Sequence, residues 1–459
     1  MKAGLWWLWA ALMVGAARAE TLSVVFTPQD PQARARGRLI VLACTGEFSS
    51  VSRAGLLRAY AGRMLSRKVD LAAGQSVDID LGELPAGYTH LGVTVDSNQN
   101  FMWRGMADAG EFSSRRVMVR NGADRSLRLD EQARAPQPVG DDWLQEHEVG
   151  GVRLLVGLPP GYEEGQQTYP VLYVIHGFNG DRWSYRRRYQ QWQQWMRREP
   201  MILVSLDCYG EYGHHLFLDS AGNGNRMQVL REQIVPHIDR HFRSNGRRVL
   251  FGHSSGGWTV VSLLRRCGDL FAGGCASAPD PLTLGPWWRG DADNLYVDRA
   301  GQERYFAPCL KLSMRRFVDC ERESDSYGQF TGFLAPFSGR VESTGWLRFE
   351  SPFNLESGEL NPAVWRHWED QDQLLWAREH PDQARSAWHG RLRLVVGDRD
   401  EFGLTPTTRA FSQELERLNI EHEYLEIEGA GHFNLEEVED AGGRLWKALY
   451  QLATVEKQG

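Results

Sequence analysis

The chain has 459 residues, of which 42% are hydrophobic and 24% charged, a balance typical of a globular protein with room for more than one domain. This composition excludes a mainly disordered, collagen-like or coiled-coil protein, and only the first segment is continuously apolar. The formal net charge of −7 argues against nucleic acid as a partner, because phosphate binding requires a clustered basic face.

The N-terminus has the pattern of a secretory signal peptide. Lys2 is followed by an apolar run over residues 5–16 and by Ala-Arg-Ala, which fits a small-x-small cleavage site. We expect a signal peptide over residues 1–19, a mature chain from Glu20, export to the periplasm or the medium, and no membrane insertion after cleavage. The alternative is an uncleaved anchor, although the run is short for a bilayer span. The first cysteine is Cys44, so a lipid anchor has no attachment point.

Residues 20–130 are predicted to form a small β-sandwich-like domain. Residues 38–43 fit a buried strand, and apolar residues alternate with polar or small ones over 76–81 and 91–95, as in strands with one buried face. Residues 131–142 contain two prolines and an Asp-Asp pair, and we interpret them as a linker.

From residue 143 to residue 459 the pattern becomes that of an α/β protein. Apolar residues recur every three or four positions over 227–242, and Thr405-Pro406 fits the start of another helix. Continuous apolar runs indicate strands buried on both faces, and we expect a doubly wound sheet with helices on both sides. These runs lie at residues 171–175, 201–206, 249–251, 392–396 and 424–427.

Residues 279–390 interrupt this alternation with a stretch that has no strong strand. An insertion here lies at the C-terminal edge of the sheet, where α/β enzymes bind ligands, so we interpret it as a cap or lid. Its tryptophans either form a sugar- or aryl-binding surface or, as we prefer, fill the core of a cap that lacks regular structure. They are Trp287, Trp288, Trp346, Trp365, Trp368, Trp376 and Trp388.

The strongest chemical signal is a G-x-S-x-G motif at residues 252–256, with Ser254 at its centre. An apolar strand over 248–251 precedes the motif and a helical pattern follows it, which is the setting that a nucleophile elbow requires. The flanking glycines leave room for the tight turn. Ser255 does not fit the motif, because His253 stands two residues before it. We therefore predict that Ser254 is a nucleophile.

A serine nucleophile needs a base and an acid, which in this setting follow it in the order Asp, His. His432 lies directly after the predicted strand 424–427 and fits the base. The acid, which orients the imidazole, is Asp400 or Asp398, since both follow the preceding strand. We prefer Asp400 because it lies further into the loop, while Asp398 could cap the turn or pair with Arg399.

An acyl-transfer reaction also needs two backbone N–H groups for its oxyanion. Ser255, the residue after the nucleophile, is predicted to supply the first. Phe178 is the candidate for the second, with Gly177 next, because both follow an apolar strand and the glycine lets the backbone approach the substrate. We interpret His176 as a structural loop residue, and the pair 214–215 (His-His) either lines the pocket or has a plain loop role.

The cysteines suggest disulfides rather than a metal site. In an exported chain we expect Cys267 to pair with Cys275 and Cys309 with Cys320, from their closeness in the sequence, although sequence alone does not fix the connectivity. No C-x-x-C or H-E-x-x-H motif occurs, and we expect neither a metal nor a cofactor.

These motifs resemble those of the putative esterase group of α/β-hydrolases, which includes esterase D, feruloyl esterases, enterochelin esterases and mycolyltransferases. The shared motifs are HGFNG at 176–180, GHSSGG at 252–257 and GAGH at 429–432. The similarity covers about residues 150–280 and 390–450. It implies an α/β-hydrolase fold with the nucleophile at Ser254, the acid at Asp400 and the base at His432. Exported bacterial members with an N-terminal β-domain look most similar.

We therefore predict an exported serine hydrolase, a carboxylesterase that works through an acyl-enzyme. The expected partner is a small-molecule, glycan or aryl ester substrate. The long insertion departs from the small members of the group, so their substrates cannot be transferred. Three alternatives stay open: an acyltransferase of the same fold, a serine peptidase, and a catalytically silent protein that binds a glycan or a surface partner.

Overall fold

The computed structural model describes residues 21–44, 60, 62–83, 88–104, 110–114, 117–118, 126–133, 143–439 and 443–454. The predicted signal peptide and residues 134–142 of the predicted linker lie outside these ranges, so both stay predictions. Within them, we find no helix with the length and apolar character that a membrane crossing requires.

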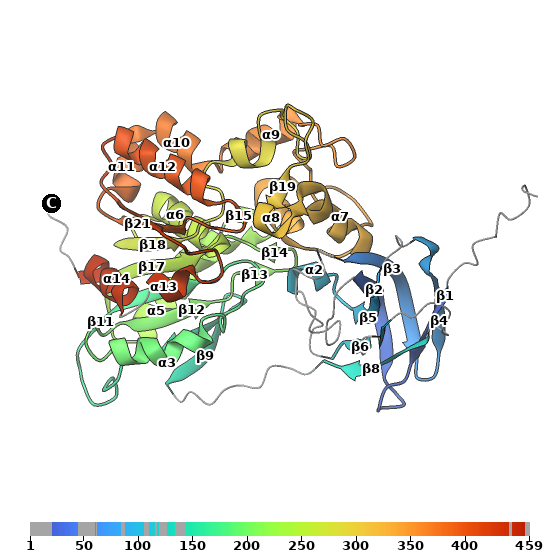
Figure 1. Cartoon of the computed structure of the whole chain (residues 1–459). Coiled ribbons are helices and arrows are strands. Elements are labelled where there is room, and N and C mark those ends of the chain that lie inside the picture. Colours follow the sequence, from blue (N-terminus) through green and yellow to red (C-terminus); the bar gives the residue numbers. More distant parts are fainter. Residues whose placement is uncertain are drawn as a thin grey trace, which may run out of the picture.

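The N-terminal part of the chain forms a β-rich domain beside the larger α/β domain (Figure 1). Its sheet runs in the order β3-β2-β5-β6-β8-β1-β4, with β7 paired to β5, and only β1 and β8 pair in parallel. Both edge strands contribute to one hydrophobic cluster, so the sheet curls around its own core. The strands are β1 (Thr21–Phe26), β2 (Arg34–Cys44), β3 (Arg63–Ala72), β4 (Ser76–Asp80), β5 (His90–Asp96), β6 (Phe112–Ser114), β7 (Val117–Met118) and β8 (Ser126–Gln132).

Strand β2 is buried on both faces along its second half, as its apolar sequence predicts. Successive side chains of a strand point to opposite faces. Leu39 and Val41 belong to the core of the N-terminal sheet, whereas Ile40 and Leu42 belong to the large core of the α/β domain and its insertion. The N-terminal domain therefore packs on the rest of the chain through this strand.

The larger domain is built on a sheet in the order β22-β21-β18-β17-β11-β12-β10-β9. The strands from β22 to β12 are parallel, and β10 and β9 extend one end of the sheet in antiparallel fashion. They are β9 (Leu144–Val149), β10 (Val152–Gly157), β11 (Tyr169–Ile175), β12 (Ile202–Leu206), β17 (Ser244–His253), β18 (Gly273–Ser277), β21 (Leu392–Gly397) and β22 (Glu423–Ile427).

Helices cover both faces of this sheet, which confirms the predicted doubly wound α/β fold. Alternate residues of β11 show the two layers: Val171 and Tyr173 face a core shared with α5, α6 and α12, and Leu172 and Val174 face a core shared with α3 and α14. The helices are α3 (Arg186–Trp195), α5 (Val235–His241), α6 (Ser255–Arg266), α12 (Thr405–Arg417), α13 (Leu435–Glu439) and α14 (Arg444–Thr454).

The insertion between β18 and β21 has more regular structure than the sequence led us to expect. Some of its helices begin at side-chain caps: Ser313 accepts from the Arg316 N–H, and Asp372 accepts from the Leu375 N–H. The preferred interpretation of its tryptophans as core residues is supported, since Trp288, Trp368 and Trp388 are fully buried. The helices are α7 (Met314–Ser324), α8 (Gln329–Phe337), α9 (Pro362–Glu369), α10 (Gln373–Glu379) and α11 (Pro381–Trp388).

The N-terminal domain lies beside α7 (Figure 1). Polar contacts as well as apolar packing hold the two together. The Glu323 carboxylate accepts from Arg63 Nη1 at 2.9 Å and from the Met64 N–H at 3.1 Å. Arg316 donates to the same carboxylate at 2.7 Å and to the carbonyl oxygens of Tyr60 and Gly62. Arg316 and Glu323, two turns apart on α7, thereby bind the start of β3 and the residues just before it.

The expected disulfides are wrong, because neither proposed pair is joined. Cys267 belongs to the core on one face of the large sheet, whereas Cys275 belongs to the core on the other face. Cys309 is exposed and Cys320 is buried. Closeness in sequence was therefore a poor guide, since Cys267 ends helix α6 on one face of the sheet, whereas Cys275 of strand β18 contributes to the core on the other face.

Candidate active site

A sharp turn between β17 and α6 carries the predicted nucleophile. Ser254 has φ 57° and ψ −122°, a conformation that L-residues rarely adopt. A Cβ atom at Gly252 would lie 2.3 Å from the Gly256 carbonyl oxygen, and one at Gly256 would lie 2.2 Å from the Ile175 carbonyl oxygen. Only glycine fits at these two positions, so the motif that singled out Ser254 is required by the local packing.

The predicted acid and base meet at the same edge of the sheet. His432 Nδ1 lies 2.8 Å from Asp400 Oδ2, and both side chains are buried. The other oxygen of Asp400 accepts from the N–H groups of Phe402 and Leu404, which fixes the carboxylate in its turn. Asp398 instead accepts from the Gly429 N–H at 2.7 Å. Of the two acids that the sequence left open, Asp400 is the one in contact with the imidazole.

Ser254 and His432 open onto a shared pocket of about 620 Å³. Its wall comes from the loop after β11, from α3 and from the segment around His432. The mixture of charged, polar and aromatic side chains suits a small polar ligand. The lining residues are Gly177, Phe178, Asn179, Gly180, Ser184, Tyr185, Arg188, Gln191, His253, Ser254, His432, Phe433 and Glu437.

Two of the predicted oxyanion residues lie at this pocket. Gly177 and Phe178 line it together with Ser254, and a Cβ atom at Gly177 would lie 3.0 Å from the Cβ of Ser254. Ser255 is the first residue of α6, where N–H groups point out of the helix end. The arrangement brings backbone from two loops to the nucleophile, and the donor roles stay predictions.

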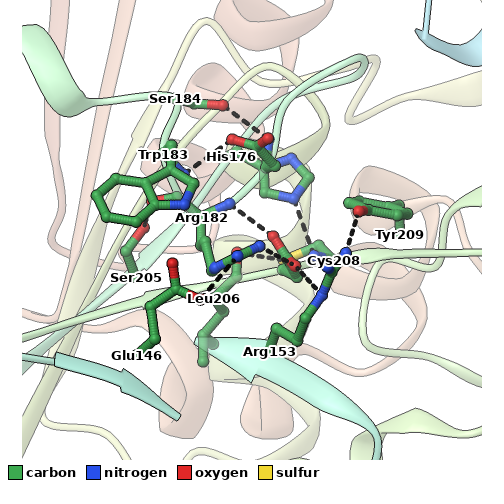
Figure 2. A network of polar contacts seen from close by, with 12 residues as sticks. Glu146, Arg153, His176, Arg182, Trp183, Ser184, Ser205, Leu206, Cys208 and Tyr209 are labelled. Atoms are coloured by element: carbon green, nitrogen blue, oxygen red, sulfur yellow. Dashed lines mark hydrogen bonds and ion pairs between the residues drawn. The ribbon is translucent and has the colours of Figure 1, made fainter. Parts of the chain in front are cut away.

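The loop that carries Phe178 is fastened to the loop after β12 by a polar network (Figure 2). Asp207 accepts from the Arg182 N–H at 2.7 Å and from Arg182 Nη1 at 3.0 Å. Arg182 Nη2 also donates to Glu146 of β9 at 3.0 Å. His176 donates from Nδ1 to the Gly177 carbonyl and accepts at Nε2 from the Cys208 N–H at 2.8 Å. His176 therefore has the structural role that we expected.

The side chains of His176, Cys208 and His214 lie close enough for a metal ion, with their ligand atoms within 4.8 Å of one another. Their nitrogens, however, are engaged in hydrogen bonds within the protein. His214 Nε2 bonds to the His176 carbonyl at 2.9 Å, and its Nδ1 accepts from the Leu216 N–H. Burial lowers the pKa of His214 well below its usual value. Of the two roles left open for His214, the structure supports the structural one.

His432 has further neighbours that sequence reasoning did not identify. Its backbone N–H donates to Glu401 Oε2 at 2.5 Å, and the Phe402 ring lies 4.8 Å from the imidazole between ring centroids. The His253 ring lies 4.5 Å away, and burial lowers the pKa of His253 well below its usual value, so this second imidazole is neutral. The base thus has several fixed contacts besides Asp400.

The nucleophile itself contacts a residue that sequence reasoning missed. Ser254 Oγ donates to Asp280 Oδ1 at 3.1 Å, and Ser255 Oγ donates to Asp280 Oδ2 at 2.6 Å. Asp280 follows β18, which the sequence did not reveal, because its Gly-Gly-Cys-Ala-Ser sequence lacks a strong strand pattern. Burial raises the pKa of Asp280, while the two hydroxyl groups and His432 oppose that shift.

Comparison with known proteins places the chain in a family. A feruloyl esterase ("ferulic acid esterase") is 17% identical and aligns over 68% of this chain and 96% of its own, with a TM-score of 0.42. The Staphylococcus aureus fluorophosphonate-binding serine hydrolase F is 12% identical, with 68% and 98% covered and a TM-score of 0.43. An S-formylglutathione hydrolase from Agrobacterium tumefaciens is 14% identical, with 68% and 94% covered and a TM-score of 0.43. No curated protein matches.

The family assignment rests on a sequence model rather than on these distant structures. The model described as "Putative esterase" matches residues 150–457, which is most of the chain and nearly all of the α/β domain. The matched segment contains the strained serine turn, the loop of Phe178 and the Asp400–His432 pair. The chain therefore belongs to the putative esterase family of α/β-hydrolases.

Proposed function

We propose that this protein is a serine carboxylesterase with Ser254 as nucleophile, His432 as base and Asp400 as orienting acid. The observation that carries the proposal is the convergence at one pocket of a strained serine turn and a buried Asp–His pair. Three loops that follow parallel strands supply these residues. This order of roles is the one that acyl transfer in α/β-hydrolases requires.

In the proposed reaction, His432 takes the proton of Ser254 as the serine oxygen attacks the ester carbonyl. The N–H groups of Ser255 and Phe178, with Gly177 as the alternative to Phe178, bind the oxyanion. His432 then protonates the leaving alcohol, and water releases the acid from the acyl-enzyme. The hydrogen bond of Asp400 engages His432 Nδ1, so that Nε2 is the nitrogen that takes the serine proton.

The pocket supports a small ester with both aromatic and polar groups as substrate. Tyr185 and the exposed ring of Phe433 offer apolar surface, and Phe433 is 60% exposed. Arg188, Gln191 and Glu437 offer hydrogen bonds and charge at the same pocket. An aryl ester or an acylated glycan combines these properties.

Export is part of the proposal and is supported by the N-terminal sequence alone. In an exporting bacterial host, the protein recovered outside the cytoplasm should have a mature N-terminus at Glu20. N-terminal sequencing of that product tests this part, and a product that keeps residues 1–19 would contradict it.

Ester turnover tests the proposed chemistry. The purified protein should hydrolyse p-nitrophenyl acetate and feruloyl or acetylated-glycan esters, and Ser254→Ala should abolish the hydrolysis. Adding a glycerol or sugar acceptor distinguishes hydrolysis from acyl transfer by the products formed. A p-nitroanilide assay tests the peptidase alternative. A folded wild-type protein without ester turnover would contradict the proposal.

A further inference from the structure

A buried carboxylate at the serine turn has no part in the mechanism described above. Asp280 is 5% exposed and lies just beyond β18, at the carboxyl edge of the sheet. Each of its carboxylate oxygens accepts a serine hydroxyl, from Ser254 at 3.1 Å and from Ser255 at 2.6 Å. Its backbone N–H donates to the Ser254 carbonyl at 3.1 Å. Side chain and main chain of Asp280 thus both fix the turn.

Burying the Asp280 carboxylate against the two serines costs hydration free energy, and packing alone does not explain why a charged residue stands here. A carboxylate loses favourable hydration when it is buried, and an uncharged residue could hold two hydroxyl groups at a smaller cost. The compensation comes from the polar partners: the two serine hydroxyls and the charge of His432 favour the ionised form, and Asp400 disfavours it. Asp280 therefore interacts electrostatically with His432 and also binds the Ser254 hydroxyl.

Charged side chains face His432 from several elements, and Arg188 of α3 and Glu437 of α13 line the same pocket. Asp400 and Glu401 belong to the loop after β21, Asp280 follows β18, and the neighbouring His253 is neutral because burial lowers its pKa. When the imidazole takes the serine proton, Asp280 is the carboxylate on the nucleophile's side and Asp400 is the one on the far nitrogen.

We propose that Asp280 is a positioning residue of the active site, which binds the Ser254 hydroxyl in the resting enzyme and stabilises the protonated imidazole of His432 during attack. The inference rests on the proposed function and deepens it. Ser254 Oγ leaves Asp280, its proton passes to His432 Nε2, and Oγ bonds to the ester carbon as the carbonyl electron pair moves to oxygen. Asp280 stays ionised and forms no covalent bond.

The test compares Asp280→Asn with a matched variant, Asp96→Asn. Asp96 is also a buried carboxylate that accepts backbone N–H groups, and burial raises its pKa too, but it lies in β5 of the N-terminal domain. The readout is the pH dependence of kcat/KM for p-nitrophenyl acetate, together with the rate of fluorophosphonate labelling over the same pH range. Its acid limb reports the protonation of the catalytic base.

Loss of the Asp280 charge should move the acid limb of Asp280→Asn to lower pH by about 0.5–1 unit, because the imidazolium loses a neighbouring negative charge. The limb of Asp96→Asn should coincide with that of the wild type. A purely structural role would lower the fraction of active protein without moving the limb. If Asp280→Asn does not fold, Asp280→Ser, which also removes the charge, serves in its place.

The outcomes separate this inference from the proposed function. An active wild type with an unmoved acid limb in the folded Asp280 variant would overturn the positioning role and leave the esterase proposal intact. A wild type that neither hydrolyses esters nor labels would overturn the esterase proposal, and the role of Asp280 with it. A shift in both the Asp280 and the Asp96 variants would also overturn the specific role of Asp280.

Discussion

The carboxyl edge of the large sheet and the junction between the N-terminal domain and α7 are both polar clusters, but they are built differently. At the sheet edge, Ser254, Asp400 and His432 each follow the strand that positions them. At the junction, Glu323 binds Arg63 across 260 residues of sequence. At the sheet edge the order of the strands brings the residues together. At the junction they meet only because the two domains dock.

Local sequence can therefore specify the interactions at the sheet edge, but not those at the domain junction. Parallel strands end at one edge, so polar residues directly after such strands are brought together by topology. Contacts across a domain junction depend on surfaces that form only after both domains have folded. The predictions below test each region separately, beginning with the sheet edge.

The largest effect should come from Asp400→Asn. This change should lower kcat for ester hydrolysis by about 10³–10⁴-fold, because the amide favours the wrong imidazole tautomer. Asp398→Asn is the matched control, since Asp398 bonds to the Gly429 N–H rather than to His432. Its kcat should stay within about threefold of the wild type. Steady-state kinetics on both variants measure these values of kcat. An equal loss of kcat in the two variants would refute the assignment of Asp400 as the acid.

A smaller effect should follow from loosening the loop of Phe178. Arg182→Met removes both side-chain bonds to Asp207 and Glu146, and it should lower kcat by about 10–100-fold as the backbone donors shift. Arg153→Met is the control, because Arg153 approaches the same Asp207 from a half-exposed position at 3.3 Å. Rates are compared per labelled site, so that unfolded protein does not count. A normal kcat in Arg182→Met would show that the network does not position the donors.

These two regions also show how far the sequence could predict the molecule. Ser254 and Asp400 follow strands with strong apolar patterns, whereas His432 follows the partly exposed edge strand β22, and the structure brings the three residues together at one edge. Asp280 was not predicted as a site residue, because the preceding strand β18 has two glycines and only a weak strand pattern. Helix α8 was missed although its phenylalanines follow a helical spacing, because Gly332 and Pro336 within it are poor helix formers. The contacts of Glu323 leave no local signal in the sequence.

On the same helix α7, but at its contact with α8, Glu321 should make stability depend on pH. Burial raises its pKa to about 7, although it accepts from the N–H groups of Phe330 and Thr331. The folded protein holds this proton between its unfolded pKa near 4.5 and about 7, where the unfolded chain has lost it. Stability from this group is therefore fully present below about pH 4.5 and is lost as pH rises to 7, by about 3 kcal/mol.

Urea denaturation of the wild type and of Glu321→Gln at pH 5, 6, 7 and 8 measures this dependence. The amide does not titrate, so the variant should be less stable than the wild type at pH 5 and should show a flatter dependence over this range. Identical slopes in the two proteins would exclude Glu321 as the source.

The smallest effect concerns the docking of the N-terminal domain. Glu323→Gln weakens the bonds to Arg63 and Arg316 and should destabilise the protein by about 1–2 kcal/mol. The kcat of the folded variant should be unchanged, because these contacts lie away from the pocket residues. Denaturation curves and ester kinetics on the same preparation test both statements. A large fall in kcat would mean that the junction controls the site.

The most direct test of the central claim is covalent labelling by a fluorophosphonate, followed by peptide mass mapping. The account predicts a single adduct on Ser254 in the wild type, none in Ser254→Ala, and strongly slowed labelling in His432→Ala. An adduct on the neighbouring Ser255, or labelling that persists in folded Ser254→Ala, would contradict the assignment of the nucleophile.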